Sequence, residues 1–140
     1  MEFIHGLANL RRQRKECATT IGNFDGIHLG HQRVLEQLMK ITKHSNLIST
    51  VLIFEPQPME YFNLDTAPSR LTRLREKLRQ FSRYNIDRVV CLKFNQKLAN
   101  FSASEFVDNI LLGGLAARKI IVGNDFRFAK NREGDYQYLS

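Results

Sequence analysis

The sequence lacks any run approaching the roughly 18 consecutive apolar residues that a helix needs to cross a bilayer, and it is poor in cysteine. Residues 1–6 also lack the basic-then-apolar pattern of a secretory signal. The only two cysteines, Cys17 and Cys91, lie far apart, which excludes a CxxC redox pair and a zinc knuckle. We therefore expect a cytoplasmic protein with buried, reduced thiols and no membrane partner.

Negative charge is also scarce: 21 Lys and Arg stand against 14 Asp and Glu, a formal net charge of +7. A basic surface attracts polyphosphates and so suggests nucleic-acid binding. The pattern argues against that interpretation, because residues 11–15 form only a short cluster and residues 70–79 are interleaved with leucines at helical spacing. We expect both clusters to be solvated surface, and an anionic small substrate explains the remaining bias equally well.

Internal repeats and low-complexity segments are absent, and 140 residues with 43% hydrophobic content fit one domain that can bury a core. Short β-rich runs alternate with helical patterns, which predicts a parallel sheet with helices packed on its faces. The expected strands are 17–21, 47–54, 87–92 and 119–122. The expected helices are 31–41, 69–84 and a third that Gly113 and Gly114 end. The third begins either with a capping box at Ser102 and Glu105 or one turn later.

Polar and glycine- or proline-rich tracts follow the expected strands, at residues 22–30, 55–63 and 123–135. Open sheets of this kind bind ligands beyond the carboxyl ends of their strands, where helix N-termini point inward. We therefore expect the functional site at that edge of the sheet.

The most informative tract runs from Gly22 to His31, directly after the first expected strand, and reads GNFDGIHLGH. Its three glycines let the backbone approach a phosphate closely, and the positive end of the following helix attracts an anion. His28 and His31 place two imidazoles beside that anion. This arrangement suits attack on a phosphoryl group, where catalysis consists mainly of positioning and electrostatic stabilisation.

Other motifs do not account for this tract. It lacks the lysine of a P-loop, and its glycine spacing differs from GxGxxG. Metal binding by the two histidines is a rival interpretation, although an i, i+3 pair without a third His or a Cys nearby is a weak ligand set. Capping or packing at the loop-to-helix junction explains either histidine alone better than both together.

The HxGH element after a GxFD turn resembles the first motif of the HIGH-type nucleotidyltransferase superfamily. The longer string GNFDGIHLGHQ resembles the bacterial bifunctional riboflavin kinase/FMN adenylyltransferases, or FAD synthetases. The likeness continues in order through residues 54–58, 70–77, 101–107 and 122–128. It implies an α/β fold with a Rossmann-like parallel sheet flanked by helices.

The resemblance implies that a phosphate oxygen of FMN attacks the α-phosphorus of ATP, with Mg²⁺ on the triphosphate, so that pyrophosphate leaves and FAD forms. His28 and His31 would be the catalytic residues that stabilise the transferring phosphate. The residues that would bind the nucleotide are Gly22, Asn23, Phe24, Asp25 and Gly30. Those that would bind the flavin are Pro56, Pro58, Asn63, Gly123, Asp125 and Phe126.

Each of these roles has a structural alternative. The prolines could serve only to end a strand, since neither donates a ladder hydrogen bond. Core packing is as good an explanation as ligand contact for Phe24, Phe126 and Phe128. Asp25 could orient the loop backbone, as Asp often does in turns.

The sequence departs from the resemblance in several places. Gln57 stands where many relatives have His, and Ala129 where they usually have Gly. The family's second motif, of Ser-Ser-Thr-x-x-Arg type, and its riboflavin kinase module are expected after residue 140. We therefore expect residues 1–140 to be an incomplete FMN adenylyltransferase domain of a longer polypeptide, weak or inactive on its own.

Two alternative functions remain open at this point. One is transfer to another phosphorylated small molecule, such as glycerol phosphate or phosphopantetheine. The other is a non-catalytic nucleotide- or RNA-binding module that relies on the +7 charge, although no RNP-type aromatic motif is present. The tracts around Pro56 and Val122 favour the flavin.

Overall fold

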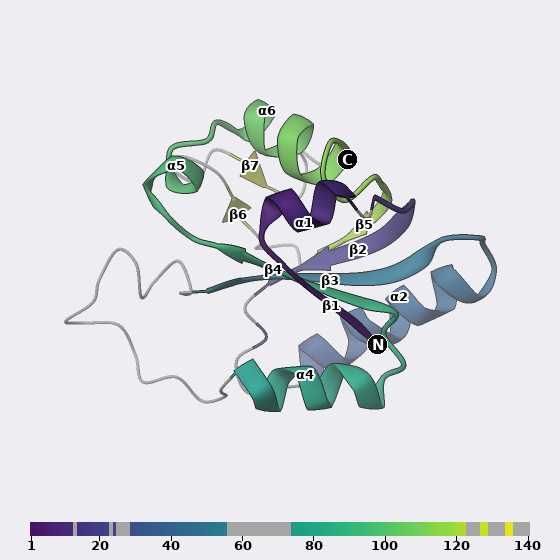
Figure 1. Cartoon of the computed structure of the whole chain (residues 1–140). Helices are drawn as coiled ribbons and strands as arrows, with labels where there is room; N and C mark the ends of the chain where they lie inside the picture. The colour runs from purple at the N-terminus through teal and green to yellow at the C-terminus, as the bar shows by residue number, and fades with distance from the viewer. Residues whose placement is uncertain are drawn as a thin grey trace.

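Five parallel strands form one sheet in the computed structural model of the chain (Figure 1). The structure describes residues 1–12, 14–22, 24, 29–55, 74–122, 127–128 and 134–135. The strand order is β1-β4-β3-β2-β5. The strands are β1 (Glu2–His5), β2 (Cys17–Ile21), β3 (Ile48–Glu55), β4 (Arg88–Lys93) and β5 (Ala117–Ile121).

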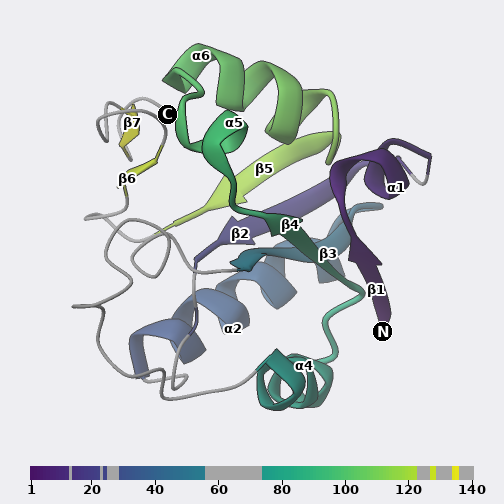
Figure 2. The ribbon, with the colours of Figure 1, turned by 60° about the vertical axis from the view of Figure 1, so that its left-hand side comes forward.

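Helices cover both faces of this sheet, as Figure 2 shows most clearly. On one face lie α2 (Leu29–Lys43) and α4 (Leu74–Arg83). On the other lie α1 (Leu7–Arg12), α5 (Gln96–Ala99), α6 (Ala103–Phe106) and the π-helix η1 (Val107–Leu112). A short antiparallel pair, β6 (Arg127–Phe128) with β7 (Gly134–Asp135), is separate from the main sheet. The expected α/β fold with a parallel sheet flanked by helices is confirmed.

Two apolar cores result, one on each face of the sheet. Successive residues of β3 alternate between them: Leu52 and Phe54 pack with α6 and η1, whereas Val51 and Ile53 pack with α2 and α4. A central parallel strand is buried on both faces, which explains why β3 reads as an almost continuous apolar run. The residues of β2 are likewise all buried.

The strand order places a topological switch point between β2 and β5. From β2 the chain continues to β3, which pairs with one edge of β2, and then to β4, which pairs with β3. It then returns to β5, which pairs with the other edge of β2. Loops that leave neighbouring strands in opposite directions open a crevice beyond the carboxyl ends of those strands, where α/β proteins bind ligands.

The sequence predicts most of these elements closely. The strand at 17–21 is confirmed. The other three expected strands correspond to β3, β4 and β5, and their ends differ from the observed ends by one or two residues. The helix expected at 31–41 extends at both ends to become α2. Among the described residues, five elements have no counterpart in the sequence-based expectation: β1, α1 and α5 at the edges of the fold, and the short strands β6 and β7.

The capping box is confirmed: the backbone N–H of Glu105 donates to Ser102 Oγ, and the N–H of Ser102 donates to the Glu105 carboxylate, both at 3.1 Å. The helix continues as η1 and ends at Gly113 and Gly114, as expected. Gly113 has an ordinary helical φ of −71°. A Cβ there would lie 2.8 Å from the carbonyl oxygen of Asp108, so close packing, and not backbone conformation, requires the glycine.

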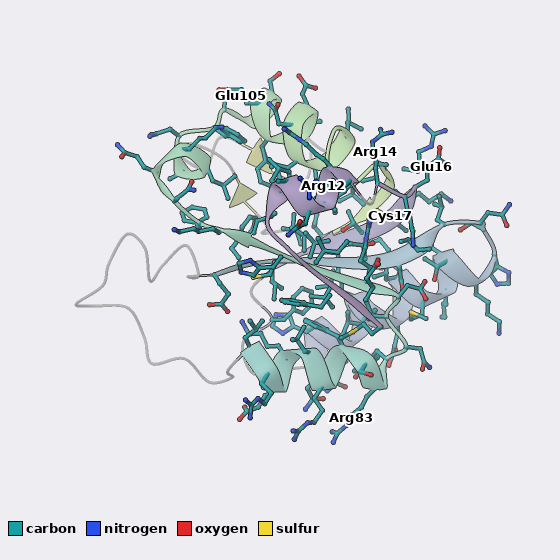
Figure 3. All side chains as sticks on the ribbon, viewed as in Figure 1. Arg12, Arg14, Glu16, Cys17, Arg83 and Glu105 are labelled. Atoms are coloured by element: carbon teal, nitrogen blue, oxygen red, sulfur yellow. The ribbon has the colours of Figure 1, made fainter. Side chains whose placement is uncertain are left out.

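Where the structure describes the two basic clusters, every Lys and Arg except one is exposed. Arg11 and Arg12 are exposed, and Figure 3 shows Arg83 extending from α4 away from the sheet. The prediction that residues 70–79 form a solvated helix face is wrong for Lys77, which is 0% exposed. Lys77 lies three residues after Leu74 and four before Phe81, and this spacing puts it on the apolar face of α4.

Polar side chains tie the strands together at their amino ends. Asp87 Oδ2 accepts hydrogen bonds from the backbone N–H of Ser49 at 2.9 Å and from its Oγ at 3.2 Å, and the N–H of Asp87 donates to the same Oγ at 2.8 Å. The fully buried Arg88 donates to Thr50 Oγ1 at 3.1 Å and to the carbonyl of Leu115 at 3.3 Å. These bonds join β3, β4 and the segment before β5.

Both cysteines are free and buried, as predicted. Burial raises the pKa of the Cys17 thiol, and a hydrogen bond with Thr50 and the charge of Arg88 oppose the increase. Cys17 Sγ donates to the carbonyl of Leu115 at 3.3 Å, so the thiol belongs to the polar network at the amino edge.

Replacing Ser49 with Ala removes the hydroxyl that bridges β3 and β4. We expect the free energy of unfolding to fall by about 0.5–1.5 kcal/mol, because the partly buried N–H of Asp87 loses its hydrogen bond to the fully buried Ser49 Oγ. Urea denaturation measures this change. Ser104→Ala, at an exposed helical position, is the control and should change stability by less than about 0.5 kcal/mol; equal effects of the two substitutions would contradict the role given to Ser49.

Candidate active site

The turn after β2 leaves the sheet at the switch point. The N–H of Gly22 donates to the carbonyl of Leu52 at 3.2 Å, which extends the pairing of β2 with β3 by one bond. Of the turn itself the structure describes Gly22 and Phe24, and α2 begins at Leu29. The N-terminus of α2 therefore lies at the carboxyl edge of the sheet.

Phe24 has a backbone conformation that bulky residues rarely adopt. Its φ is +52°, in the left-handed region, yet its side chain is only 2% exposed. Such a conformation costs about 1–3 kcal/mol and persists only where surrounding contacts enforce it. Strained residues of this kind cluster at functional sites.

Gly22 makes room for this arrangement. A Cβ at position 22 would lie 3.1 Å from Cε2 of the Phe24 ring, closer than ordinary van der Waals contact. The ring of Phe24 folds back over the end of β2 and packs in the core formed with α2 and α4. Glycine at position 22 thus allows the close approach of the Phe24 ring.

Three aromatic rings from three segments form a stack beneath the turn. The ring of Phe24 lies 4.9 Å from the imidazole of His31, with the planes at 48°, and 5.4 Å from the ring of Phe81 in an edge-on arrangement. His31 comes from the first turn of α2 and is half-buried, whereas Phe81 comes from α4 and is fully buried. The stack fixes the position of the His31 ring at the edge of the sheet.

The first turn of α2 is suited to an anion. It contains no acidic residue, while Lys40 and Lys43 occupy the last turn, so the side-chain charges agree with the helix dipole. The positive end of the dipole coincides with the positions of Gly30 and His31. Phosphate groups are the anions most often bound at such helix N-termini at a switch point.

The structure brings together Gly22, Phe24, Gly30 and His31, four of the residues expected from the sequence. The remaining expected residues lie outside the described part of the chain, as do Gln57 and Ala129. Their flanking residues are placed, since Glu55 ends β3 and Val122 follows β5. The remaining residues are His28, Asn23, Asp25, Pro56, Pro58, Asn63, Gly123, Asp125 and Phe126.

The side chain of Phe24 packs in the core, which is the structural alternative to ligand contact given above. Because that ring is buried between His31 and Phe81, any contact of Phe24 with a nucleotide would come from its backbone. Sequence reasoning missed Phe81 as part of this site, since its position on an apolar helix face indicated only core packing. No sequence signal paired it with Phe24.

A groove of about 590 Å³ lies elsewhere, at the amino edge of the sheet. Its lining includes Lys40 near the end of α2, Leu47 before β3 and Tyr84 after α4. It is therefore at the opposite end of α2 from His31. Within the described residues, no group of three or more His, Cys, Asp and Glu side chains could hold a metal ion, and no helix is long and apolar enough to span a membrane.

Comparison with known sequences assigns a family to this turn and the fold that carries it. The sequence pattern of FAD synthetase matches residues 10–140, which include the whole of the turn, α2 and the strands on either side of the switch point. The chain belongs to the FAD synthetase family.

Curated relatives within this family carry one name, bifunctional riboflavin kinase/FMN adenylyltransferase. The chain is 46% identical to the Pseudomonas fluorescens protein over 139 residues, 44% to that of Escherichia coli strain K12 over 140, and 42% to that of Buchnera aphidicola from Schizaphis graminum over 139. Each comparison covers 99% of this chain but only 44–45% of the relative. The chain thus spans less than half the length of these relatives.

The fold also occurs in a solved structure. A crystal structure described as a macrolide-efflux protein from Streptococcus pneumoniae superposes with a TM-score of 0.81 at 21% identity, over 99% of this chain and 54% of the other. At this level of identity the likeness shows a shared fold and supports no statement about function.

The packing of Phe24 on Phe81 is testable by a double-mutant cycle. Replacing both with Leu should reveal a coupling free energy of about 0.5–1.5 kcal/mol in urea unfolding, the usual worth of an aromatic pair beyond its burial. The control cycle combines Phe24→Leu with Phe94→Leu, because Phe94 packs on Phe54 in the other core. Those two effects should add; additive effects of the Phe24 and Phe81 variants would instead contradict the stack.

Proposed function

We propose that this chain provides the adenylyl-transfer site of an FMN adenylyltransferase, which transfers AMP from ATP to FMN and releases FAD and pyrophosphate. The observation that carries the proposal is the half-buried imidazole of His31, held by Phe24 at the N-terminus of α2 and at the switch point of a parallel sheet. Membership of the FAD synthetase family and the shared name of its relatives support the choice of substrates.

The chemistry requires an electrostatic site more than a covalent one. A phosphate oxygen of FMN attacks the α-phosphorus of ATP, the bond to pyrophosphate breaks, and negative charge spreads over the oxygens of the transferring group. In the proposed mechanism, His31 and His28 donate hydrogen bonds to these oxygens, and the dipole of α2 stabilises the same charge. Because the aromatic stack fixes His31 before the substrates bind, little reorganisation accompanies the reaction.

ATP would enter as its magnesium complex, so that Mg²⁺ belongs to the substrate and neutralises charge on the triphosphate. Residues 22–25 and Gly30 would surround the nucleotide, with Phe24 contributing backbone. Proximity of these groups to His31 follows from their position in one turn of the chain. Asp25 is the one acidic residue among those proposed to bind the nucleotide.

The strand order favours a flavin subsite that flanks this turn. Because β2 lies between β3 and β5, the segments after Glu55 and Val122 begin on opposite sides of the turn after β2. The residues expected to bind the flavin fall in these two segments: Pro56, Pro58 and Asn63 in the first, and Gly123, Asp125 and Phe126 in the second. We propose that FMN binds there with its phosphate toward His31.

The relatives' names support a further proposal about the whole polypeptide. We infer that residues 1–140 are the adenylyltransferase part of a bifunctional protein that also contains a riboflavin kinase module, which would supply FMN to this site. Both cysteines are free, in agreement with a reducing compartment such as the cytoplasm.

His31→Ala, made in the full-length protein that contains this sequence, should lower kcat for FAD formation by roughly 10²–10³-fold, the scale for losing one preorganised donor. His28→Ala should act similarly. Steady-state assays that follow FAD and pyrophosphate measure both. His44→Ala is the matched control, because His44 is exposed and follows the far end of α2; it should retain wild-type kcat, and an unchanged kcat for His31→Ala would remove that residue from the mechanism.

The identity of the acceptor is tested by comparing three phosphorylated compounds as substrates. With ATP present, FMN should be adenylylated, whereas glycerol phosphate and phosphopantetheine should not be, because they lack the planar ring system that the flanking segments are proposed to bind. Quenching of flavin fluorescence reports binding, and product analysis reports transfer. Transfer to either other acceptor at a rate equal to that with FMN would refute the flavin assignment. Salt-sensitive RNA binding without any preference for ATP or FMN would favour a non-catalytic module.

A further inference from the structure

Lys77 is a fully buried lysine close to the proposed site. Its side chain is 0% exposed on the inner face of α4, together with Phe81. Lysine is almost never buried completely, because its ammonium group must keep hydrogen-bonding or charged partners there. Burial of Lys77 removes its ammonium group from water, which costs free energy, and apolar packing alone does not explain why a lysine occupies this position.

Helix geometry places Lys77 on the side of Phe81 that is nearer the site. The two residues are four apart and so share one face of α4. The helix connects the carboxyl end of β3 to the amino end of β4, which means that its N-terminal turn is nearer the carboxyl edge of the sheet (Figure 1). Lys77 is therefore displaced from Phe81 by about 6 Å along the helix, toward the edge that carries His31.

The ring contacts connect this part of α4 to the candidate catalytic histidine. Phe81 packs edge-on against Phe24 at 5.4 Å, and Phe24 packs against His31 at 4.9 Å. A small shift of α4 along its axis would move Phe81 and thus alter the support of both the strained Phe24 and His31. Apolar contacts alone tolerate such shifts, whereas buried polar groups permit few arrangements.

We propose that Lys77 is a positioning residue for adenylyl transfer, acting through Phe81 and Phe24 to hold the imidazole of His31. Its fully buried ammonium group fixes the register of α4 against the sheet, because a buried charge permits few arrangements whereas apolar contacts permit many. This inference rests on the proposed function, because its main test measures kcat for FAD formation. It assigns to Lys77 a gain in conformational specificity, and not a gain in stability.

The test substitutes Lys77→Met in the full-length protein, because methionine fills a similar volume without the charge. We expect the melting temperature to be unchanged or higher, since a desolvated charge is removed. We expect kcat for FAD formation to fall by about 10²-fold, the scale for a misplaced catalytic group, with the KM for FMN nearly unchanged. The ring resonances of His31 in NMR spectra should also shift.

Two variants act as comparisons. Arg79→Met is the matched control, because Arg79 is exposed on the same helix and should leave both kcat and the His31 resonances as in the wild type. Lys77→Arg keeps a cation at this buried position and should recover most of the lost kcat. If Lys77→Met does not fold, Lys77→Gln replaces it, and the same loss of kcat is expected.

The outcomes separate this inference from the proposed function. Wild-type kcat in a folded Lys77→Met or Lys77→Gln protein overturns the inference and leaves the proposed function intact. A lower melting temperature with wild-type kcat well below that temperature shows a purely structural lysine and also overturns it. Absence of FAD formation by the wild-type protein overturns the proposed function itself, and the shift of the His31 resonances then still decides whether Lys77 positions that ring.

Discussion

The left-handed backbone of Phe24 is the constraint on which the site depends. A phenylalanine does not adopt a φ of +52° through its own preference, and the conformation persists because its ring is buried between His31 and Phe81. Gly22 permits this packing because it has no Cβ to meet the ring. The ring of Phe24 therefore both keeps this backbone conformation in place and contacts the candidate catalytic imidazole.

The sheet supplies the rest of the geometry. Polar cross-links join the strands at their amino edge through Asp87 and Arg88, whereas the residues proposed to bind the substrates follow the strands at the carboxyl edge. The strand order reverses between β2 and β5, beside the turn after β2, and α/β proteins bind ligands at such a position. The stabilising polar contacts and the proposed site thus occupy opposite edges of one sheet, which fits the expectation for doubly wound α/β proteins.

The sequence predicts the centre of this fold better than its edges. β2 and β3 are buried on both faces, so their apolar runs stand out, and the capping box at Ser102 is a local signal that the structure confirms. In β1 only Ile4 is buried, and in α1 only Leu10, which gives too little periodicity to detect either element. Their structure comes from pairing with β4 and packing against the core, and the local sequence does not encode it strongly.

For the site, sequence reasoning predicts the position of the turn in the chain and the candidate catalytic and binding residues. It does not predict which side chains pack against them. The conformation of Phe24 runs against local preference and depends on Phe81, a residue distant in sequence. The burial of Lys77 contradicts the expectation for its residue type, although the helical spacing places it on the inner face. Both features arise from tertiary packing of α4, which a single sequence does not reveal.

The most direct test of the central claim is a crystal structure of the full-length protein with FMN and a non-hydrolysable ATP analogue. We predict that the α-phosphate lies at the N-terminus of α2, with one of its oxygens about 2.7–3.2 Å from a ring nitrogen of His31. The ring of Phe24 should remain packed beneath that imidazole. A triphosphate bound away from α2, for example in the groove near Lys40 and Tyr84, would contradict the account.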